Sequence, residues 1–142
     1  MKKVFTFIGI AIIIVVVTFM TRYLSYRAEK SVIAQENEEF EKYKDKEVYG
    51  LEVATLINKA VDKNTKNEIK QDDKKEFIQN TQNSIEIEIY IKDNETSYKM
   101  ETFYNGGTEK FAQYYGKEKF KCSKIEYHKS TGKISYILFE QV

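Results

Sequence analysis

An uncharged apolar segment near the N-terminus constrains this chain more than any other feature of its sequence. Val4 to Met20 is a run of 17 residues without a charge, 14 of them apolar, interrupted only by Thr6, Gly9 and Thr18. As a helix that rises about 1.5 Å per residue, the run would span roughly 25 Å, just enough to cross a bilayer. The sequence therefore predicts one membrane-spanning helix.

We expect this helix to be an uncleaved signal-anchor, because the run is longer than the about 7–15 residues of a secretory signal and residues 21–28 offer no small-x-small cleavage site. Arg22, Tyr23, Tyr26 and Arg27 follow it. Aromatic rings favour headgroup depth and long cations reach into water. These four are the candidate membrane-interface residues, and the lipid bilayer is the first expected partner.

The flanking charges leave the orientation of the span open. Lys2 and Lys3 precede it, while Arg22, Arg27 and Lys30 follow it, so the positive-inside rule does not discriminate. A short N-terminus that begins Met-Lys-Lys typically remains in the cytoplasm. We therefore expect a single-pass protein of the cytoplasmic membrane with an extracytoplasmic C-terminal domain.

The net charge of +1 conceals two oppositely charged parts. Residues 1–30 carry five basic side chains against Glu29, a balance of +4, whereas residues 31–142 carry 18 Lys against 21 acidic residues, a balance of −3. A basic anchor suits anionic headgroups. An acidic domain without Arg disfavours nucleic acid as a partner, despite 11 Tyr and 9 Phe.

Residues 31–49 predict a stalk helix, helical from Ser31 to Glu47, that follows the anchor of residues 1–30. Tyr26, Ile33 and Phe40 recur every seven residues, but the alternate positions of this repeat are acidic. A coiled coil requires both positions to be apolar. We therefore expect the stripe to rest on the protein's own domain.

Residues 50–142 predict a small α+β domain. A core helix follows Gly50, because apolar residues recur at helical spacing as far as Val61. Residues 65–84 are almost entirely polar and predict a loop, or a short surface helix from Asp72, that supplies little core. Such a loop is either a tolerated insertion or a segment that binds a partner.

Two β-hairpins are predicted after this loop. In the first, isoleucines alternate with polar residues from Ile85 to Ile91, and a two-residue turn at Asp93–Asn94 would oppose Ile89 to Tyr98 and Glu88 to Lys99. In the second, a turn at Thr131–Gly132 would oppose Tyr127 to Tyr136 and Ile125 to Leu138. Between them, Thr108 would cap a short helix that turns Phe111, Tyr114 and Tyr115 toward the sheet. The fold class is thus a transmembrane helix and a stalk helix, then a four-stranded antiparallel sheet of two hairpins packed on helices.

No catalytic or cofactor-binding constellation is recognisable. The only histidine, His128, would oppose Ser135 beside a turn, with no nucleophile brought to it, so it is a weak candidate surface site. Cys122, six residues away, would lie about 20 Å from it and is best interpreted as a buried or half-buried free thiol. One Cys and one His exclude the usual multi-ligand zinc and iron–sulfur sites. A calcium-like start at Asp62 lacks the required glycine and oxygen ligands. We expect neither a metal, nor a cofactor, nor an enzyme.

Three segments carry a family resemblance: 50–64, GLEVATLINKAVDKN; 98–103, YKMETF; and 120–140, FKCSKIEYHKSTGKISYILFE. They resemble small uncharacterised single-span membrane proteins of clostridia-like bacteria. The resemblance implies a bacterial envelope protein and brings no assigned activity with it.

The leading hypothesis is a non-enzymatic envelope protein whose domain binds another envelope protein or associates with itself. One alternative is a small-molecule or peptide-binding sensor, or a cryptic hydrolase, with a cavity between sheet and helices and His128 near its mouth. A pilin-like pseudosubunit is a further alternative, although the Gly-Phe processing site and the acidic residue of the apolar stretch are both missing.

Overall fold

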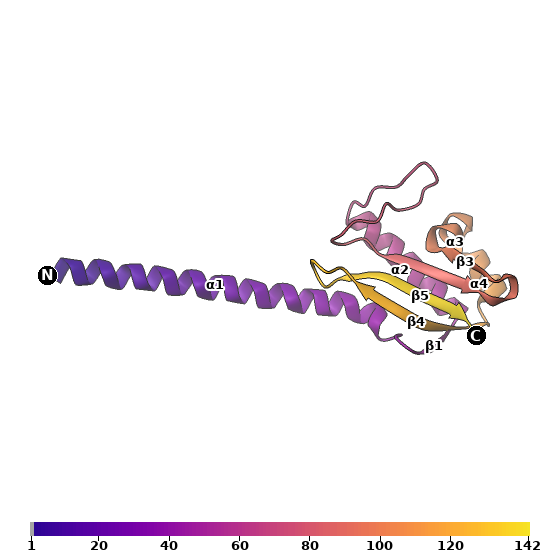
Figure 1. The fold of residues 1–142 in the computed structure, drawn as a ribbon, viewed down its shortest axis with the longest axis horizontal. Helices are drawn as coiled ribbons and strands as arrows, with labels where there is room; N and C mark the ends of the chain where they lie inside the picture. Colours follow the sequence, from indigo (N-terminus) through magenta and orange to yellow (C-terminus); the bar gives the residue numbers. More distant parts are fainter. Residues whose placement is uncertain (1) are drawn as a thin grey trace. The chain divides into compact units, whose positions relative to one another are not determined.

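The computed structural model describes residues 2–142, with side chains from residue 7 onward. The chain divides into two units, one ending at Glu36 and the other formed by Asn37–Val142. The described part of the first unit is helix α1 (Lys2–Glu41) as far as Glu36, and residues 37–41 of this helix belong to the second unit (Figure 1). From Phe7 on, this helix is long and apolar enough to cross a membrane, a property that a signal sequence would share.

The second unit is an α+β domain with a five-stranded mixed sheet in the order β1-β4-β5-β2-β3 (Figure 1). The strands are β1 (Glu47–Tyr49), β2 (Glu86–Ile91), β3 (Thr96–Lys99), β4 (Lys119–Tyr127) and β5 (Ile134–Gln141). The helices are α2 (Gly50–Lys66), α3 (Met100–Gly106) and α4 (Thr108–Tyr115). The α+β class is confirmed. The four-stranded antiparallel sheet is wrong, because β1 adds an edge strand and because β2 and β5 pair in parallel.

The predicted stalk helix ends at Glu41, earlier than expected. Asp45 adopts a left-handed conformation with φ 59°, which Asp tolerates better than most residues. Its N–H then donates to the Cys122 carbonyl, and Cys122 N–H donates to the Lys46 carbonyl. The chain is therefore drawn against β4, and residues 47–49 become strand β1 rather than helix.

The end of α1 rests on its own domain, as the sequence pattern favours. Phe40 is 1% exposed and belongs to the apolar core. Asn37 is also buried: its Nδ2 donates to the Gly132 carbonyl, and its Oδ1 accepts from Ile134 N–H. Phe40 is therefore unavailable to the coiled-coil seam that its seven-residue spacing suggests.

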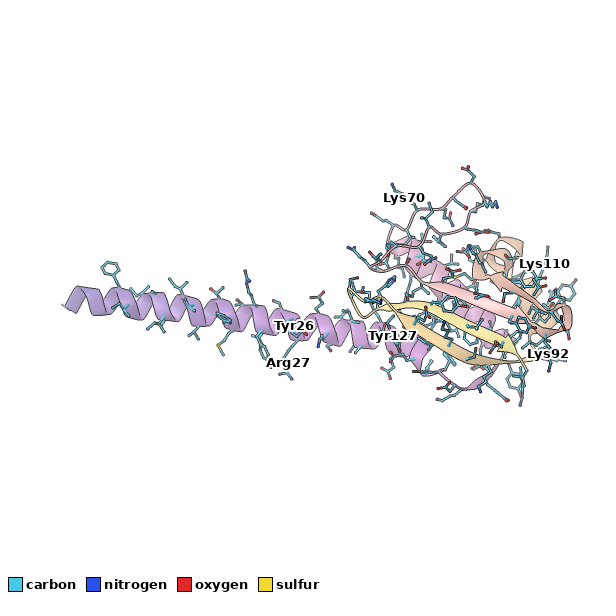
Figure 2. The ribbon with its side chains drawn as sticks, viewed as in Figure 1. Tyr26, Arg27, Lys70, Lys92, Lys110 and Tyr127 are labelled. Carbon is cyan, nitrogen blue, oxygen red and sulfur yellow. The ribbon has the colours of Figure 1, made fainter. Side chains whose placement is uncertain are left out.

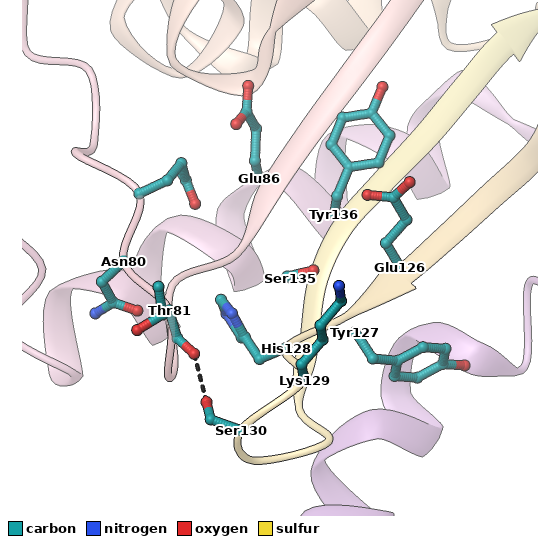
Figure 3. Close-up of a pocket in the computed structure, with 11 residues that line it drawn as sticks. Asn80, Thr81, Glu86, Glu126, Tyr127, His128, Lys129, Ser130, Ser135 and Tyr136 are labelled. Atoms are coloured by element: carbon teal, nitrogen blue, oxygen red, sulfur yellow. Dashed lines mark hydrogen bonds between the residues drawn. The ribbon is translucent and has the colours of Figure 1, made fainter.

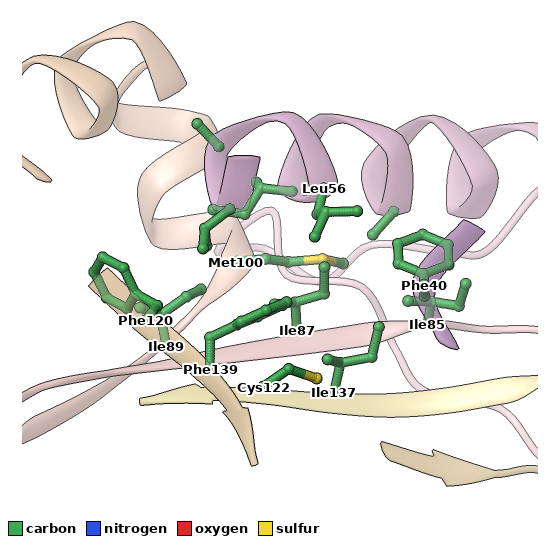
Figure 4. Packing of buried hydrophobic residues seen from close by; sticks show 14 of the residues in the cluster. Phe40, Leu56, Ile85, Ile87, Ile89, Met100, Phe120, Cys122, Ile137 and Phe139 are labelled. Atoms are coloured by element: carbon green, nitrogen blue, oxygen red, sulfur yellow. The ribbon is translucent and has the colours of Figure 1, made fainter. Parts of the chain in front are cut away.

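One face of the sheet and α2 enclose the core (Figure 4). The predicted core helix is confirmed and extends to Lys66. Its apolar stripe meets the isoleucines of β2 and the inward side chains of β4 and β5. The largest fully buried members of this core include Phe40, Leu56, Ile57, Ile87, Ile89, Met100, Phe120, Ile137 and Phe139.

The first hairpin has the predicted register, with Ile89 opposite Tyr98 and Glu88 opposite Lys99. Its connection is longer than the two-residue turn, because residues 92–94 form a short 3-10 helix and Glu95 is left-handed. Strand β3 ends at Lys99, and the next residue, Met100, is fully buried and begins α3.

The second hairpin is confirmed, but its predicted register is wrong. Glu126 lies opposite Tyr136 and Ile125 opposite Ile137, with irregularities after Cys122 and after Glu126. The turn is longer than Thr131–Gly132, because His128 N–H donates to the Lys133 carbonyl. A shift of one residue exchanges the two faces of a strand, so Ile137 and Phe139 enter the core while Tyr136 lies on the other face.

Helix α4 differs in two details from its prediction. Thr108 does not cap it: the hydroxyl donates to Asn58 Oδ1 instead, and Gly107 occupies the cap position. Phe111 is buried as expected, whereas Tyr114 is 78% exposed and does not face the sheet. Two of the three predicted sheet-facing aromatic residues, Phe111 and Tyr115, pack on the core.

The polar segment between α2 and β2 is a loop without a helix at Asp72. It gives Phe77, which is 7% exposed, and Ile85 to the core, and Ile69 packs against the core partly buried. The side chain of Asn80 organises the end of the loop, since its Oδ1 accepts backbone N–H groups from Gln82, Asn83 and Ser84. Side-chain acceptors of this kind replace the missing backbone ladder.

Candidate functional site: the uncovered face of the sheet

Among the described residues, helices lie against one face of the sheet (Figure 4), and the other face carries polar and aromatic side chains. The strand registers place three rows of residues there, which together define the uncovered face. The rows are Glu47–Lys121–Glu140–Tyr90, Lys124–Leu138–Glu88–Lys99 and Glu126–Tyr136–Glu86. In the first row opposite charges alternate from β1 to β5, which favours strand pairing, whereas the third row carries a carboxylate on each side of Tyr136.

Short polar contacts fix parts of this face. Lys124 Nζ lies 2.6 Å from Glu126 Oε1 and 5.6 Å from the centre of the Tyr136 ring. Tyr136 Oη donates to Glu88 Oε2 at 2.7 Å. This hydrogen bond lowers the pKa of Glu88, whereas burial, followed by the same hydrogen bond, raises the pKa of Tyr136. The face therefore holds one of the chain's own ammonium groups against a tyrosine ring and a carboxylate.

A groove of about 490 Å³ hollows one end of the uncovered face (Figure 3). Its walls are residues 79–81 of the loop on one side and the β4–β5 turn on the other. Glu86, Glu126 and Tyr136 form the row of the sheet that lies between them. Lys129 and Ser130 line the turn side. We call this feature the groove.

His128 is buried at the edge of the groove, with 7% of its surface exposed. Its Nε2 lies 2.7 Å from the Ser84 carbonyl, and because a carbonyl only accepts, Nε2 carries the hydrogen. Lys133 rather than Ser135 lies opposite it in the hairpin. The ring therefore fastens the β4–β5 turn to the loop.

Two hydroxyl groups strengthen the same connection. Ser130 Oγ donates to the Thr81 carbonyl at 2.5 Å, and Thr131 Oγ1 donates to the Gln82 carbonyl at 2.7 Å. The turn and the loop thus form a continuous rim. The two walls of the groove are held together at its end.

Glu86 is the carboxylate that the sequence pattern did not single out. It is half-buried, and among the described residues no hydrogen bond or ion pair is formed by its side chain. Burial raises its pKa, and the charges of Glu101, Glu88 and Glu76 add to this effect, while Lys99 opposes it. In sequence, Glu86 is only one polar position in an alternating strand, so its environment was not predictable.

Negative charge is in excess around Glu86. The ammonium of Lys99 is bonded to Glu76 at 2.8 Å. Glu101 is 3% exposed; its Oε1 accepts from Phe77 N–H, and its Oε2 is buried without a hydrogen-bond partner in the described part of the chain. A buried carboxylate oxygen without a donor is costly. The groove therefore adjoins a region that favours an additional cation.

The predicted membrane-interface residues lie together on α1, directly after the apolar segment (Figure 2). Tyr23 and Tyr26 are more than half exposed. The Arg27 guanidinium lies 5.8 Å from the Tyr23 ring centre, and the Lys30 ammonium lies 4.8 Å from the Tyr26 ring centre. Paired cations and aromatic rings one helical turn apart suit the headgroup region.

Cys122 is a free thiol that is fully buried in the core, which is one of the two environments predicted for it, buried or half-buried. Burial raises its pKa to about 11, so it is a thiol at neutral pH. Within residues 2–142, no three His, Cys, Asp or Glu side chains are arranged to hold a metal ion.

The fold and the uncovered face define a class of protein: a small α+β domain preceded by one helix that is apolar and long enough to cross a membrane. Comparisons with protein families, curated proteins and solved structures find no match to this chain.

Proposed function

We propose that this chain is a single-pass, non-enzymatic membrane protein of the bacterial cell envelope, whose α+β domain binds another envelope protein outside the cytoplasmic membrane. The observation that carries this proposal is the apolar part of α1, none of which is buried against the described residues. So large an exposed apolar surface is stable in a bilayer and unstable in water.

The uncovered face supports binding as the role of the domain. It combines half-buried aromatic and aliphatic side chains, such as Tyr136 and Leu138, with charges of both signs. Protein interfaces of the non-obligate kind have this mixed composition. His128 Nε2 donates its hydrogen to a backbone carbonyl, and Cys122 is buried in the core on the opposite side of the sheet. Neither side chain is therefore placed to act on a ligand at this face, which favours binding over catalysis.

Membrane insertion and orientation are tested together. The wild-type chain should remain in membranes after alkaline carbonate extraction, whereas I13K/V16K should be released, because each central Lys costs about 3 kcal/mol of insertion. A C-terminal alkaline phosphatase fusion should be active and a C-terminal fluorescent-protein fusion dark. The reverse pair of reporter signals would place the domain in the cytoplasm, and loss of a processed N-terminal fragment would identify a cleaved signal.

Partner binding is tested by photo-crosslinking in intact cells. A photoreactive residue replaces Leu138 on the uncovered face, and Glu109 on α4 serves as the matched control position. We expect a discrete crosslinked complex from position 138 and none from position 109. Recovery of the monomer alone from both positions would contradict the proposal.

A second candidate function is a sensor that binds a small molecule or a peptide. The groove favours it, but the expected site between sheet and helices is filled by the core side chains of Figure 4. A sensor would therefore use the groove. Thermal stabilisation of the purified domain by a soluble extract freed of protein would support the sensor, and its absence would leave protein binding as the function.

A further inference from the structure

The sheet row in the groove carries two carboxylates, of which one is paired with a cation of the chain. Glu86 and Glu126 flank the Tyr136 ring in one row across β2, β5 and β4. The Glu126 carboxylate already holds the Lys124 ammonium at 2.6 Å. Glu86 lies on the other side of the ring (Figure 3), and none of the ion pairs among the described residues includes it.

The cation whose charge acts on Glu86, Lys99, is already paired with another carboxylate. The Lys99 ammonium lies 2.8 Å from a Glu76 carboxylate oxygen. The region around it contains four carboxylates that interact electrostatically with Lys99 or with Glu86, namely Glu76, Glu86, Glu88 and Glu101. One of them, Glu101, has a buried oxygen that accepts no hydrogen bond from the described residues. The local excess of negative charge therefore attracts a cation from outside the chain.

The chemistry of that cation is indicated by Lys124. Its ammonium contacts a carboxylate and lies over the Tyr136 ring, an arrangement that uses both a charge-assisted hydrogen bond and a cation–π contact. A second ammonium between Tyr136 and Glu86 would repeat the same pair of contacts. A groove of about 490 Å³ has room for a lysine side chain and the peptide units beside it.

We propose that the groove binds a lysine side chain of the partner protein, with Glu86 as the carboxylate that receives its ammonium group. This inference rests on the proposed function, because it names the chemistry by which the partner is recognised. Lys129 on the turn side opposes the cation, so the ammonium enters on the side of Glu86. Glu86 is here a binding residue and has no catalytic role.

The purified full chain in detergent micelles tests the groove without the partner. Nα-acetyl-lysine methylamide, which keeps its charged ε-ammonium, should shift the backbone amide resonances of Glu86 and Tyr136 in a saturable way. The uncharged Nα-acetyl-norleucine methylamide should not. E86Q should weaken the binding about tenfold, the effect of losing one charge-assisted hydrogen bond. E109Q, an equivalent change on the exposed surface of α4, should leave the binding unchanged.

A second variant tests the sign of the interaction. K129Q removes the positive charge that opposes the ligand and should tighten binding about twofold. Weaker binding in K129Q would show that Lys129 contributes a favourable contact rather than opposing the ligand. Equal binding of the lysine and norleucine compounds would show that the ammonium charge does not contribute to binding. Either result, or wild-type affinity in E86Q, would overturn the inference.

Crosslinking in cells separates this inference from the proposed function. A photoreactive residue at Ser135, in the groove, should capture the partner in the wild type and much less of it in E86Q. Equal capture by E86Q would leave the proposed function intact and overturn the inference. Failure to capture any protein from the uncovered face would contradict the proposed function. The NMR titration of the purified chain with the lysine compound would still show whether the groove binds an ammonium group.

Discussion

The carboxamide of Asn64 forms two hydrogen bonds with the backbone of Ile85. Its Nδ2 donates to the Ile85 carbonyl at 2.8 Å, and its Oδ1 accepts from Ile85 N–H at 2.8 Å. Asn64 is fully buried in α2, and Ile85 stands immediately before β2. The side chain therefore completes the backbone hydrogen bonding at the point where the loop returns to the sheet.

Asn64→Ala should destabilise the domain by about 2–4 kcal/mol, because it leaves a buried N–H and a buried carbonyl without partners. Asn58→Ala, on the exposed side of the same helix, loses only the exposed hydrogen bond from the Thr108 hydroxyl and should cost less than about 1 kcal/mol. Urea unfolding of the full chain in micelles, followed by fluorescence of its tyrosines, measures both. Similar midpoints for the two variants would refute the structural role of Asn64.

Gly50 should not accept a side chain. A Cβ at this position would lie 2.0 Å from the Tyr115 carbonyl oxygen, a backbone atom that cannot rotate away. We expect Gly50→Ala to cost about 1–3 kcal/mol. Gly106→Ala is the control, because its Cβ would meet no atom within 4 Å. It should be neutral or stabilising by up to about 1 kcal/mol, and the same urea titration distinguishes the two glycines.

Cys122 should be almost inert in the folded protein. With a pKa of about 11 instead of 9.0, roughly one thiol in a thousand is ionised at pH 8, about a hundredfold less than for an unperturbed thiol. Reaction with Ellman's reagent should accelerate more than about a hundredfold in urea. C122S carrying Ser31→Cys provides an exposed thiol for comparison, and equal rates for the two folded proteins would rule out burial of Cys122.

Glu39 and Glu86 should give pH dependences of opposite sign. Hydrogen bonding to Lys63 lowers the pKa of Glu39, so its stabilisation is present above pH 4.5 and is lost as the pH falls. Burial raises the pKa of Glu86, so its contribution is greatest below pH 4.5 and is lost as the pH rises through the folded-state pKa. Relative to wild type, E39Q should therefore be less stable at pH 7, and E86Q should be equally or more stable.

The urea midpoint of unfolding, measured from about pH 3.5, below the ordinary carboxyl pKa values, to about pH 8, well above them, reports both effects. The E39Q deficit should shrink on acidification, and any E86Q gain should also shrink. A deficit in E86Q at pH 7 would show that Glu86 forms a favourable ion pair in the folded domain.

The sequence predicted features that depend on local periodicity. The membrane-length apolar run, the core helix after Gly50 and the register of the first hairpin all follow from the spacing of apolar residues within a few turns or strands. The pairing of Glu88 with Lys99 also followed, because it is favourable only in that register. These interactions link residues that are close in sequence.

Features that depend on distant pairings were not predicted. Strand β1 exists only because β4 offers it an edge, through contacts such as that of Asp45 with Cys122. The parallel pairing of β2 and β5 leaves no local signature. The groove was missed for the same reason, because the loop, β2 and the β4–β5 turn approach one another only in the folded domain. The apolar spacing of the core helix reaches only Val61, whereas Asn64, beyond it, is a buried anchor.

The position of β5 has a consequence for the timing of folding. This strand contains nearly the last residues of the chain, yet it lies between β4 and β2 and joins the two halves of the sheet. No complete core can form until residue 141 has emerged from the ribosome. Until then β2 and β4 lack the strand that joins them, so the residues already made remain without a common core.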